Sequence, residues 1–327
     1  MKIQSKAFVQ TIKVNGQEID KTVLVSCAYI ESLDLSSPCI ITSFKDDRGD
    51  LRDDLKLGEG AIIDLEFGDV DGRGRAMFQE SFVISDAPIR NNVIHAEGFS
   101  KAINALKQPA VKPKFLVDKP VETILATLCE GTGLAIQCSV SGVGTYHLNY
   151  DMTPSRLIRN IARDFGAAVW VSRGVLYFRP YEELMSQAPA YKVGLNAKDV
   201  DIDITKHEVV KNQKQFERVA QKNFFSWSID KGMQASVTNA DKSKVLVTTN
   251  QSQLNNLSKY AQPLLVLECY GISDLQPSNM LDFILVRLSN DESLDESLPN
   301  RMFITRITHY TQGERYLINA EVGVSNE

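Results

Sequence analysis

The sequence has few of the features that identify a secreted, membrane or disulfide-bonded protein. It contains five cysteines, an odd number, and no C-x-x-C pair. This pattern indicates reduced thiols rather than a disulfide framework or a zinc site. The longest apolar runs are far too short to span a bilayer, so we expect no membrane insertion. The first residues include no apolar segment of the kind found in a secretory signal.

Positive charge is also scarce. The 327 residues carry 36 Lys and Arg against 41 Asp and Glu, which gives a formal net charge of −5. A protein whose main surface grips nucleic acid is normally basic, so this balance argues against stable DNA binding but allows DNA in transit. The hydrophobic content of 43% and the charged content of 24% are those of an ordinary globular protein. The length allows two or more domains.

Motifs for catalysis and ligand binding are missing as well. The histidines are scattered at His95, His147, His207 and His309 without any metal-binding spacing, so we interpret them as structural or surface residues. There is no G-x-S-x-G and no phosphate-binding loop, and Gly142-Val143-Gly144 is a lone G-x-G without a following helix. We therefore predict no enzyme activity, no catalytic residues, no metal and no cofactor.

Short alternating runs dominate residues 1–108. The predicted strands are residues 22–30, 61–67, 76–84 and 92–98. Cys27 alternates with Val23, Val25 and Tyr29, which indicates a shared core face. A glycine-rich loop at 68–74 joins two of the strands. Strands this short and this closely spaced predict a β-barrel or a sandwich.

The apolar period changes to that of helices within residues 109–190, after a linker at 107–114. Val121, Ile124, Leu125 and Leu128 are spaced for one helix face. Thr153 is placed to cap a second helix, with Pro154 at its first position. The buried stripe of that helix is predicted to be Leu157, Ile158, Ile161 and Phe165. A hairpin follows at 167–180, so this part of the chain predicts a small α/β insert.

Strands return in residues 191–327. They are predicted at 199–204, at 216–229 and from 264 to 324, where an acidic loop at 290–297 interrupts them. Residues 252–261 predict a short helix with Leu254 and Leu257 inward. At the end, residues 301–311 and 315–322 alternate around the polar turn 312–314, which predicts a β-hairpin. Its buried residues are expected to be Phe303, Ile304, Ile307 and Tyr316. His309 and Tyr316 are expected to pack together across it.

The run 199–204 places three carboxylates, Asp199, Asp201 and Asp203, on one predicted strand face. Such a group suits a divalent cation or a glycosidase pair. A solvated strand face explains it more simply, because like charges on one face also discourage edge-to-edge aggregation. In a ring-forming subunit the same carboxylates could face a shared channel.

The order of these elements resembles a known family. A strand at 264–271, the segment L-Q-P-S-N-M at 275–280, a strand at 281–288 and a hairpin containing His309-Tyr310 and Tyr316 resemble the closing barrel of the central baseplate hub of bacteriophage tails. The strand, acidic segment and Gly58-Glu59-Gly60 before residue 61 resemble its first barrel. The helix–glycine–hairpin unit at 153–180 resembles the module between them.

The resemblance implies an α+β fold: two tail-tube-like antiparallel β-barrel domains, at 1–108 and 191–327, with an inserted α/β module at 109–190. It implies a structural hub in the virion tail, assembled in the cytoplasm of the bacterial host. A homotrimer with an internal duplicate would give pseudo-sixfold symmetry and join a hexameric tail tube to a trimeric spike. Because the chain ends soon after the second barrel, we expect the spike to be a separate protein. Tape-measure and wedge proteins are further expected neighbours, and DNA is expected only in transit.

Two other classes of function are compatible with a β-rich chain. A tail-associated glycan hydrolase would need two carboxylates converging in a cleft. A carbohydrate-binding β-sandwich for host attachment would need exposed aromatic residues in its loops. The predicted loops 68–74, 290–300 and 312–314 contain none, which argues against the sandwich.

Overall fold

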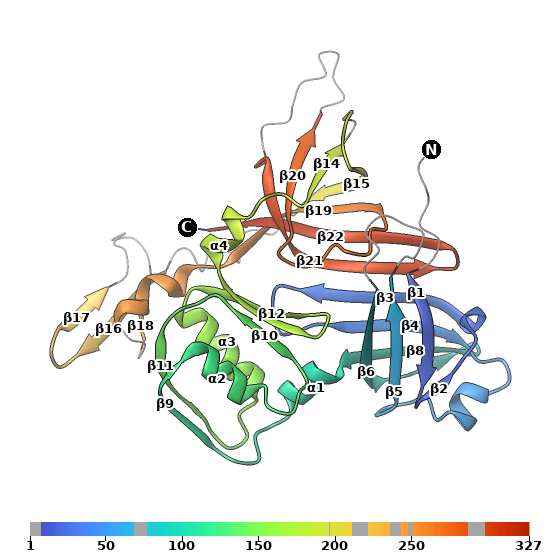
Figure 1. Ribbon diagram of the computed structural model, residues 1–327, viewed down its shortest axis with the longest axis horizontal. Coiled ribbons are helices and arrows are strands. Elements are labelled where there is room, and N and C mark those ends of the chain that lie inside the picture. The colour runs from blue at the N-terminus through green and yellow to red at the C-terminus, as the bar shows by residue number, and fades with distance from the viewer. Residues whose placement is uncertain are drawn as a thin grey trace.

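The computed structural model describes residues 8–68, 77–195, 197–210, 222–235, 243–247, 251–286 and 298–326. The predicted acidic loop 290–297 and nearly all of the predicted loop 68–74 lie outside these residues. Figure 1 shows a first β-sheet in blue, an α/β insert in green, and a second β-structure in orange and red above them. A small three-stranded sheet projects at one side. The prediction of two β-barrel-like halves around an α/β module is confirmed.

The first half is a curled antiparallel sheet in the order β1-β5-β6-β8-β4-β3. Its strands are β1 (Val9–Val14), β3 (Leu24–Ser32), β4 (Cys39–Lys45), β5 (Ile62–Phe67), β6 (Phe78–Asp86) and β8 (Val93–Ser100). Short additions are β2 (Gln17–Glu18), β7 (Ile89–Arg90), a 3₁₀ turn at Lys21–Val23 and a π-helical turn at Asp50–Asp54. No ladder among the described residues joins β1 to β3, so this half is open along that seam.

The expectation for Val25 is wrong. Cys27 and Tyr29 are buried as predicted, but Val25 is 40% exposed and Val23 lies in the 3₁₀ turn before the strand. The register of the β3–β4 ladder shifts between Leu24 and Ser26. Because a one-residue shift turns the following side chains to the other face, strict alternation fails at this point.

The insert begins after α1 (Lys101–Lys107). It contains β9 (Lys114–Pro120), α2 (Val121–Leu128), β10 (Ala135–Cys138), β11 (Val143–Leu148), α3 (Pro154–Asp164), β12 (Ala167–Ser172), β13 (Val175–Pro180) and α4 (Tyr181–Ser186). The predicted faces of α2 and α3 share one core cluster, although Phe165 at its edge is only partly buried. Thr153 caps α3, since its hydroxyl accepts the Arg156 N–H, and Pro154 is the first helical residue, as predicted.

Strand β12 is buried on both faces and joins the insert to the second half. Ala167, Val169 and Val171 point into the core of the insert. Ala168 and Trp170 point the other way, where they pack with Met280 and Phe303 of the second half. The β12–β13 turn at Arg173-Gly174 has positive φ at both residues, 50° and 78°, as the tightest hairpins require.

The second half is a closed barrel. Its strands are β14 (Tyr191–Leu195), β15 (Ile202–Val209), β19 (Ala261–Tyr270), β20 (Met280–Leu285), β21 (Arg301–Gln312) and β22 (Arg315–Ser325). Ladders run β21-β20-β14-β15-β19-β22 and return to β21. The pairings differ from the expected antiparallel pattern at β14, which is parallel to both β15 and β20. The predicted terminal hairpin is confirmed, with its expected residues buried.

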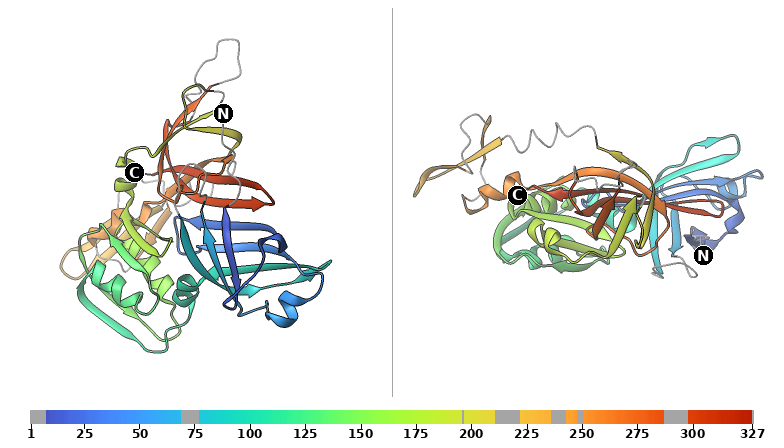
Figure 2. Two further views of the ribbon diagram at one scale, coloured as in Figure 1. Left: turned by 45° about the vertical axis from the view of Figure 1, so that its right-hand side comes forward. Right: turned by 90° about the horizontal axis from the view of Figure 1, so that it is seen from above.

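The small sheet stands apart from the barrel (Figure 2). It consists of β16 (Lys222–Ser228), β17 (Gly232–Ala235) and β18 (Ser243–Leu246). The predicted short helix is the 3₁₀ helix η3 (Gln251–Ser258), and Leu254 and Leu257 are buried against Phe224 of this sheet as expected. Every helix in the described part of the chain is too short or too polar to cross a bilayer.

Candidate functional site

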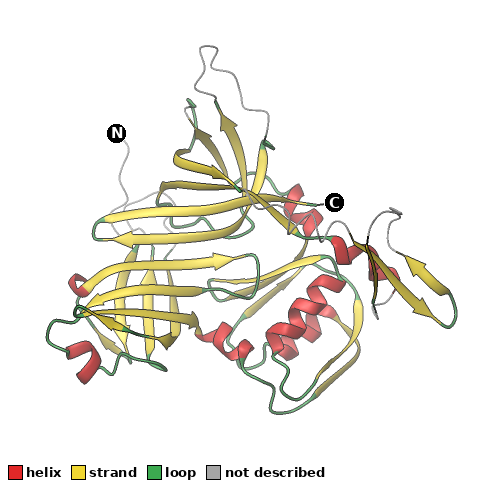
Figure 3. Cartoon of the chain, turned by 180° about the vertical axis from the view of Figure 1, so that it is seen from behind, coloured by secondary structure: helices red, strands yellow, loops and turns green. Residues whose placement is uncertain are grey.

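One continuous sheet surface crosses both halves of the molecule. Strand β3 of the first half pairs with β21 of the second over seven residue pairs, from Arg306↔Ser32 to Gln312↔Ser26. The run β8-β4-β3-β21-β22-β19 is therefore a single antiparallel sheet. Figure 3 shows the terminal hairpin lying alongside the strands of the first half. We call the outward side of this run the shared face.

The shared face is polar and carries acidic and basic side chains in equal number. Paired residues point to the same side, so ladder register and burial identify its members. They are Ser26, Ala28 and Ile30 of β3, Ile41, Ser43 and Lys45 of β4, His95 and Glu97 of β8, Arg306, Thr308, Tyr310 and Gln312 of β21, Arg315, Leu317, Asn319 and Glu321 of β22, and Val266, Glu268 and Tyr270 of β19. Its charged members are three carboxylates, Glu97, Glu268 and Glu321, and three cations, Lys45, Arg306 and Arg315.

Two hollows mark the half of the shared face that belongs to the second barrel. The larger, about 490 Å³, is lined by Thr205, Glu268, Tyr270, Glu314, Arg315, Tyr316 and Leu317. The smaller, about 200 Å³, is lined by Val266, Arg306, Thr308, Asn319 and Glu321. Both are open to solvent and lined by polar and apolar side chains together, which allows contact with a surface or a polymer.

The predicted acidic strand is wrong in part. Strand β15 begins at Ile202, and Asp199 lies before it in a left-handed conformation with φ of 58°. Asp201 also precedes the strand, and its carboxylate accepts the Lys192 N–H at 2.9 Å. Only Asp203 lies in β15, on the side opposite the buried Ile202 and Ile204. The fold-back of the chain before β15 breaks the alternation.

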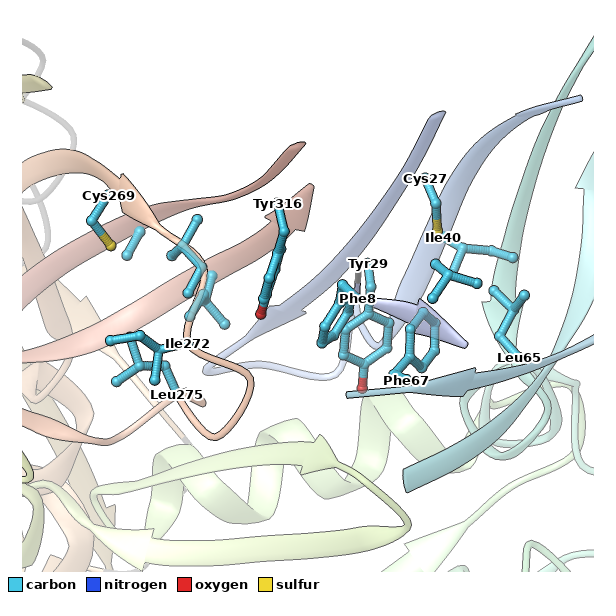
Figure 4. Packing of buried hydrophobic residues seen from close by; sticks show 14 of the residues in the cluster. Phe8, Cys27, Tyr29, Ile40, Leu65, Phe67, Cys269, Ile272, Leu275 and Tyr316 are labelled. Carbon is cyan, nitrogen blue, oxygen red and sulfur yellow. The ribbon is translucent and has the colours of Figure 1, made fainter. Parts of the chain in front are cut away.

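Behind the shared face the two halves share one aromatic core. Phe8, just before β1, stacks on His309 and on Tyr316 with ring centroids 4.7 Å apart in each case. Phe8 also stacks on Phe67 at 5.0 Å, and Tyr29 lies 4.7 Å from Phe67. Figure 4 shows Tyr316, Phe8, Tyr29 and Phe67 between the aliphatic core of the second half and that of the first.

A buried polar cluster joins this core to the insert. We define the three-way junction as Glu31 of β3, Arg173 of the β12–β13 turn, and His309 of β21, with the groups that they contact. The Arg173 guanidinium donates to the carbonyls of Ser273 (2.6 Å) and Leu275 (3.0 Å). It lies 4.0 Å from the Glu31 carboxylate. The Ser172 hydroxyl donates to Glu31 at 2.5 Å.

The contacts of His309 fix its tautomer. Its Nε2 lies 3.1 Å from the Leu275 carbonyl, which can only accept, so Nε2 carries the proton. Its Nδ1 lies 2.7 Å from the Tyr316 hydroxyl, which donates to the neutral ring. The predicted packing of His309 with Tyr316 is confirmed, and the pair is part of a larger network than a cross-strand contact.

Burial controls protonation in the junction. It raises the pKa of the Glu31 carboxyl, which the nearby Arg173 charge and the Ser172 hydrogen bond lower in turn. Glu80, which accepts the Tyr29 hydroxyl at 3.0 Å, has a pKa raised to about 8, first by burial and then by the Glu31 charge. Burial and the Arg173 charge hold the pKa of His309 well below its usual value. Glu80 and His309 are thus both neutral near pH 7.

The other polar candidates are structural or solvated. His147 and His207 are exposed, and His95 is half-buried beside the Ser43 hydroxyl at 3.0 Å. Burial raises the pKa of the Cys27, Cys129 and Cys269 thiols to about 12, so these groups are unreactive. Within the described ranges there is no cluster of three or more His, Cys, Asp or Glu that could hold a metal ion.

A search with protein-family models and a search of curated proteins found no match for this sequence. The solved structures do give matches. The tail protein from Neisseria meningitidis MC58 superposes with a TM-score of 0.62 at 12% identity, over 97% of this chain and 96% of the other. The 43 kDa tail protein of prophage MuSo2 from Shewanella oneidensis reaches 0.65 at 12% identity, over 97% and 98%.

This chain has the fold of a phage tail protein. A chain of the Francisella PdpA–VgrG complex shares that fold over 99% of this chain and 59% of its own length, with a TM-score of 0.54 and 10% identity. The tail-protein fold therefore spans nearly the whole sequence, and in the third structure it forms part of a longer chain.

Local sequence patterns do not reveal the junction beneath the shared face. The one signal for Glu31 is alternation, because it lies two residues from Tyr29 and four from Cys27 and therefore on the same core face. Arg173 reads as an ordinary turn residue, and nothing in its local sequence reveals that it reaches a loop 100 residues later in the chain.

Proposed function

We propose that this chain is the structural baseplate hub of a phage tail. The observation that carries the proposal is the pair of β-halves joined edge to edge into one sheet, within a tail-protein fold that covers 97% of the chain. Each half contributes three strands to that sheet. A subunit with two similar halves is suited to a position where the symmetry of an assembly changes.

The symmetry argument is geometric. A homotrimer of such subunits presents six β-halves in a ring, which can meet a hexameric tail tube on one side and a trimeric spike on the other. We expect the spike to be a separate chain and the tape-measure and wedge proteins to be further neighbours. The complex would be part of the virion tail and would assemble in the cytoplasm of the bacterial host. This role requires no catalysis.

We further propose that the shared face lines the channel of the ring. It runs unbroken across both halves, and its three cations are matched by three carboxylates, so it offers no basic track that would hold a phosphate backbone. Asp203 belongs to this surface in the proposal, because β15 is the neighbour of β19. Asp199 and Asp201 would lie at its rim.

The stoichiometry of the assembled particle tests the hub directly. Cryo-electron microscopy of the tail should show a threefold ring of this chain, and the isolated ring should have a mass of three times 36.5 kDa, or about 110 kDa. Isolated protein at low concentration need not be trimeric, so the particle is the stricter test. A sixfold ring or a single copy in the particle would overturn the proposal.

A further inference from the structure

We propose that the three-way junction is an acid-sensitive latch that holds the insert against the second barrel. The tip of the β12–β13 hairpin is bound there by few groups. Arg173 donates to two carbonyls of the loop between β19 and β20, at 2.6 and 3.0 Å. The hydroxyl of Ser172 lies 2.9 Å from the side chain of Gln276 in the same loop.

His309 holds the same loop from the other side. The carbonyl of Leu275 accepts from both Arg173 and the Nε2–H of His309. His309 has no exposed surface, and neither has Glu31, whose Oε2 lies 3.9 Å from its Nε2 and has no hydrogen-bond partner. The state of one buried imidazole therefore affects both the hairpin tip and the loop that receives it.

The titratable and charged groups around His309 come from every neighbouring element. They are Glu31 and Tyr29 of β3, Glu80 of β6, Arg173 of the insert, Tyr316 of β22, and Asp274, which accepts from Tyr191 of β14 at 2.6 Å. Arg173 is the only cation in this group. Its ion-pair partner is the Glu31 carboxyl, 4.0 Å away, whereas Glu80 retains its proton up to about pH 8.

Acid changes this balance through His309. Its protonation adds a second buried cation near Arg173, and a protonated Glu31 supplies no counter-charge for it. Two like charges in a buried site without a counter-charge repel each other and are poorly solvated. Separation of the hairpin tip from the loop would hydrate both charges. The sheet that joins the halves, which does not depend on these groups for its ladders, would remain intact.

The chain provides its own reporter for this separation. It contains two tryptophans. Trp170 lies three residues before Arg173, is 1% exposed, and packs against Met280 and Phe303 of the second half. Trp227 is 60% exposed on the small sheet. The variant Trp227→Phe therefore leaves a single emitter at the contact between the insert and the second half.

The experiment follows Trp170 emission in the Trp227→Phe protein from about pH 7.5 to about pH 5, with far-ultraviolet circular dichroism recorded on the same samples. We expect a shift of the emission to longer wavelength while the dichroism stays constant. Adding His309→Gln should abolish the shift, because the amide can still bond Leu275 and Tyr316 but cannot take up a proton. Adding Glu31→Gln, which removes the counter-charge at every pH, should move the midpoint to higher pH.

Several outcomes would overturn the latch. These are the absence of an emission shift, a shift that coincides with loss of the dichroism signal, and a shift unchanged by His309→Gln. Should His309→Gln fail to fold, the direction of the midpoint in Glu31→Gln decides the matter, and an unchanged or lower midpoint counts against the proposal. None of these results depends on whether the chain assembles into a ring.

Discussion

The two β-halves of this chain complete their sheets in different ways. The second is a closed barrel, in which every strand has two neighbours. The first leaves a seam between β1 and β3 among the described residues, and β3 takes its second neighbour from the other half, β21. An open strand edge can pair with other chains. In this fold the edge of β3 is covered, because it pairs with β21 of the second half.

The hydrophobic cores of the two halves also differ, in the kind of side chain that fills them. Large rings gather in the first half and at its seam, where Phe8, Tyr29 and Phe67 pack together. The second half is filled mainly by aliphatic residues such as Leu265 and Ile318. The open sheet is thus closed by aromatic packing, and that packing extends into the partner half through Phe8. We infer that the halves fold as one unit, which mutations can test.

Phe8→Ala should have the largest effect, a loss of about 3–5 kcal/mol in the free energy of unfolding, because it empties the aromatic site between the halves. Urea unfolding followed by tyrosine fluorescence and by circular dichroism should show one transition that moves to lower urea. Phe115→Ala is the matched control, since Phe115 is 67% exposed, and should change stability by about 0.5 kcal/mol or less. Two separate transitions in the parent protein would contradict the single unit.

Leu125→Ala should cost about 2–5 kcal/mol within the insert, because Leu125 is fully buried against α3 and its sheet. Val117→Ala, at a site 53% exposed on β9, provides the comparison. Hydrogen exchange should rise in α2 and α3 and remain unchanged in β5 of the first half. Equal effects of the two substitutions on stability would mean that the buried face of α2 is misassigned.

Local patterns predicted much of this fold for identifiable reasons. The α3 cap at Thr153-Pro154 and the terminal hairpin depend on residues close in sequence, and both are confirmed. The parallel pairing of β14 and the β3–β21 ladder join segments that are distant in sequence, so alternation carries no information about them. At Asp199, Asp201 and Asp203 the alternating pattern predicts a longer strand than the structure has. The residues before β15 form a folded-back loop instead.

Opposite responses to pH should distinguish the halves. The pKa of Glu80, in the first half, is raised from 4.5 to about 8 in the folded protein, so its contribution to stability is present at low pH and lost as pH rises from about 4.5 to about 8. The pKa of His309, in the second half, is lowered below 6.5, so its contribution is lost as pH falls below that value.

Glu80→Gln should therefore reduce the decline in unfolding free energy on the alkaline side and leave the acid side unchanged. Urea titrations at several pH values between about 4.5 and 8 measure this. Some decline should persist in the variant, because burial also raises the pKa of Glu31. A decline as steep in Glu80→Gln as in the parent would show that Glu80 ionises normally in the folded protein.

The smallest expected signal concerns the shared face, where the proposed ring should bind DNA poorly. Duplex titrated against the assembled ring at low salt should show no micromolar or tighter affinity, since phosphate binding needs clustered Lys and Arg.

Two charge reversals compare the halves directly: Glu97→Lys changes a residue of the first half, and Glu268→Lys changes a residue of the second. If both halves line the channel equivalently, each substitution should create weak, salt-sensitive binding of similar strength. Asp199→Lys, at the proposed rim, should have less effect than either. Binding created in one half alone would show that the halves are not equivalent around the channel. Tight binding by the unmodified ring, falling steeply with salt, would mean a basic lumen and refute the shared face as its lining.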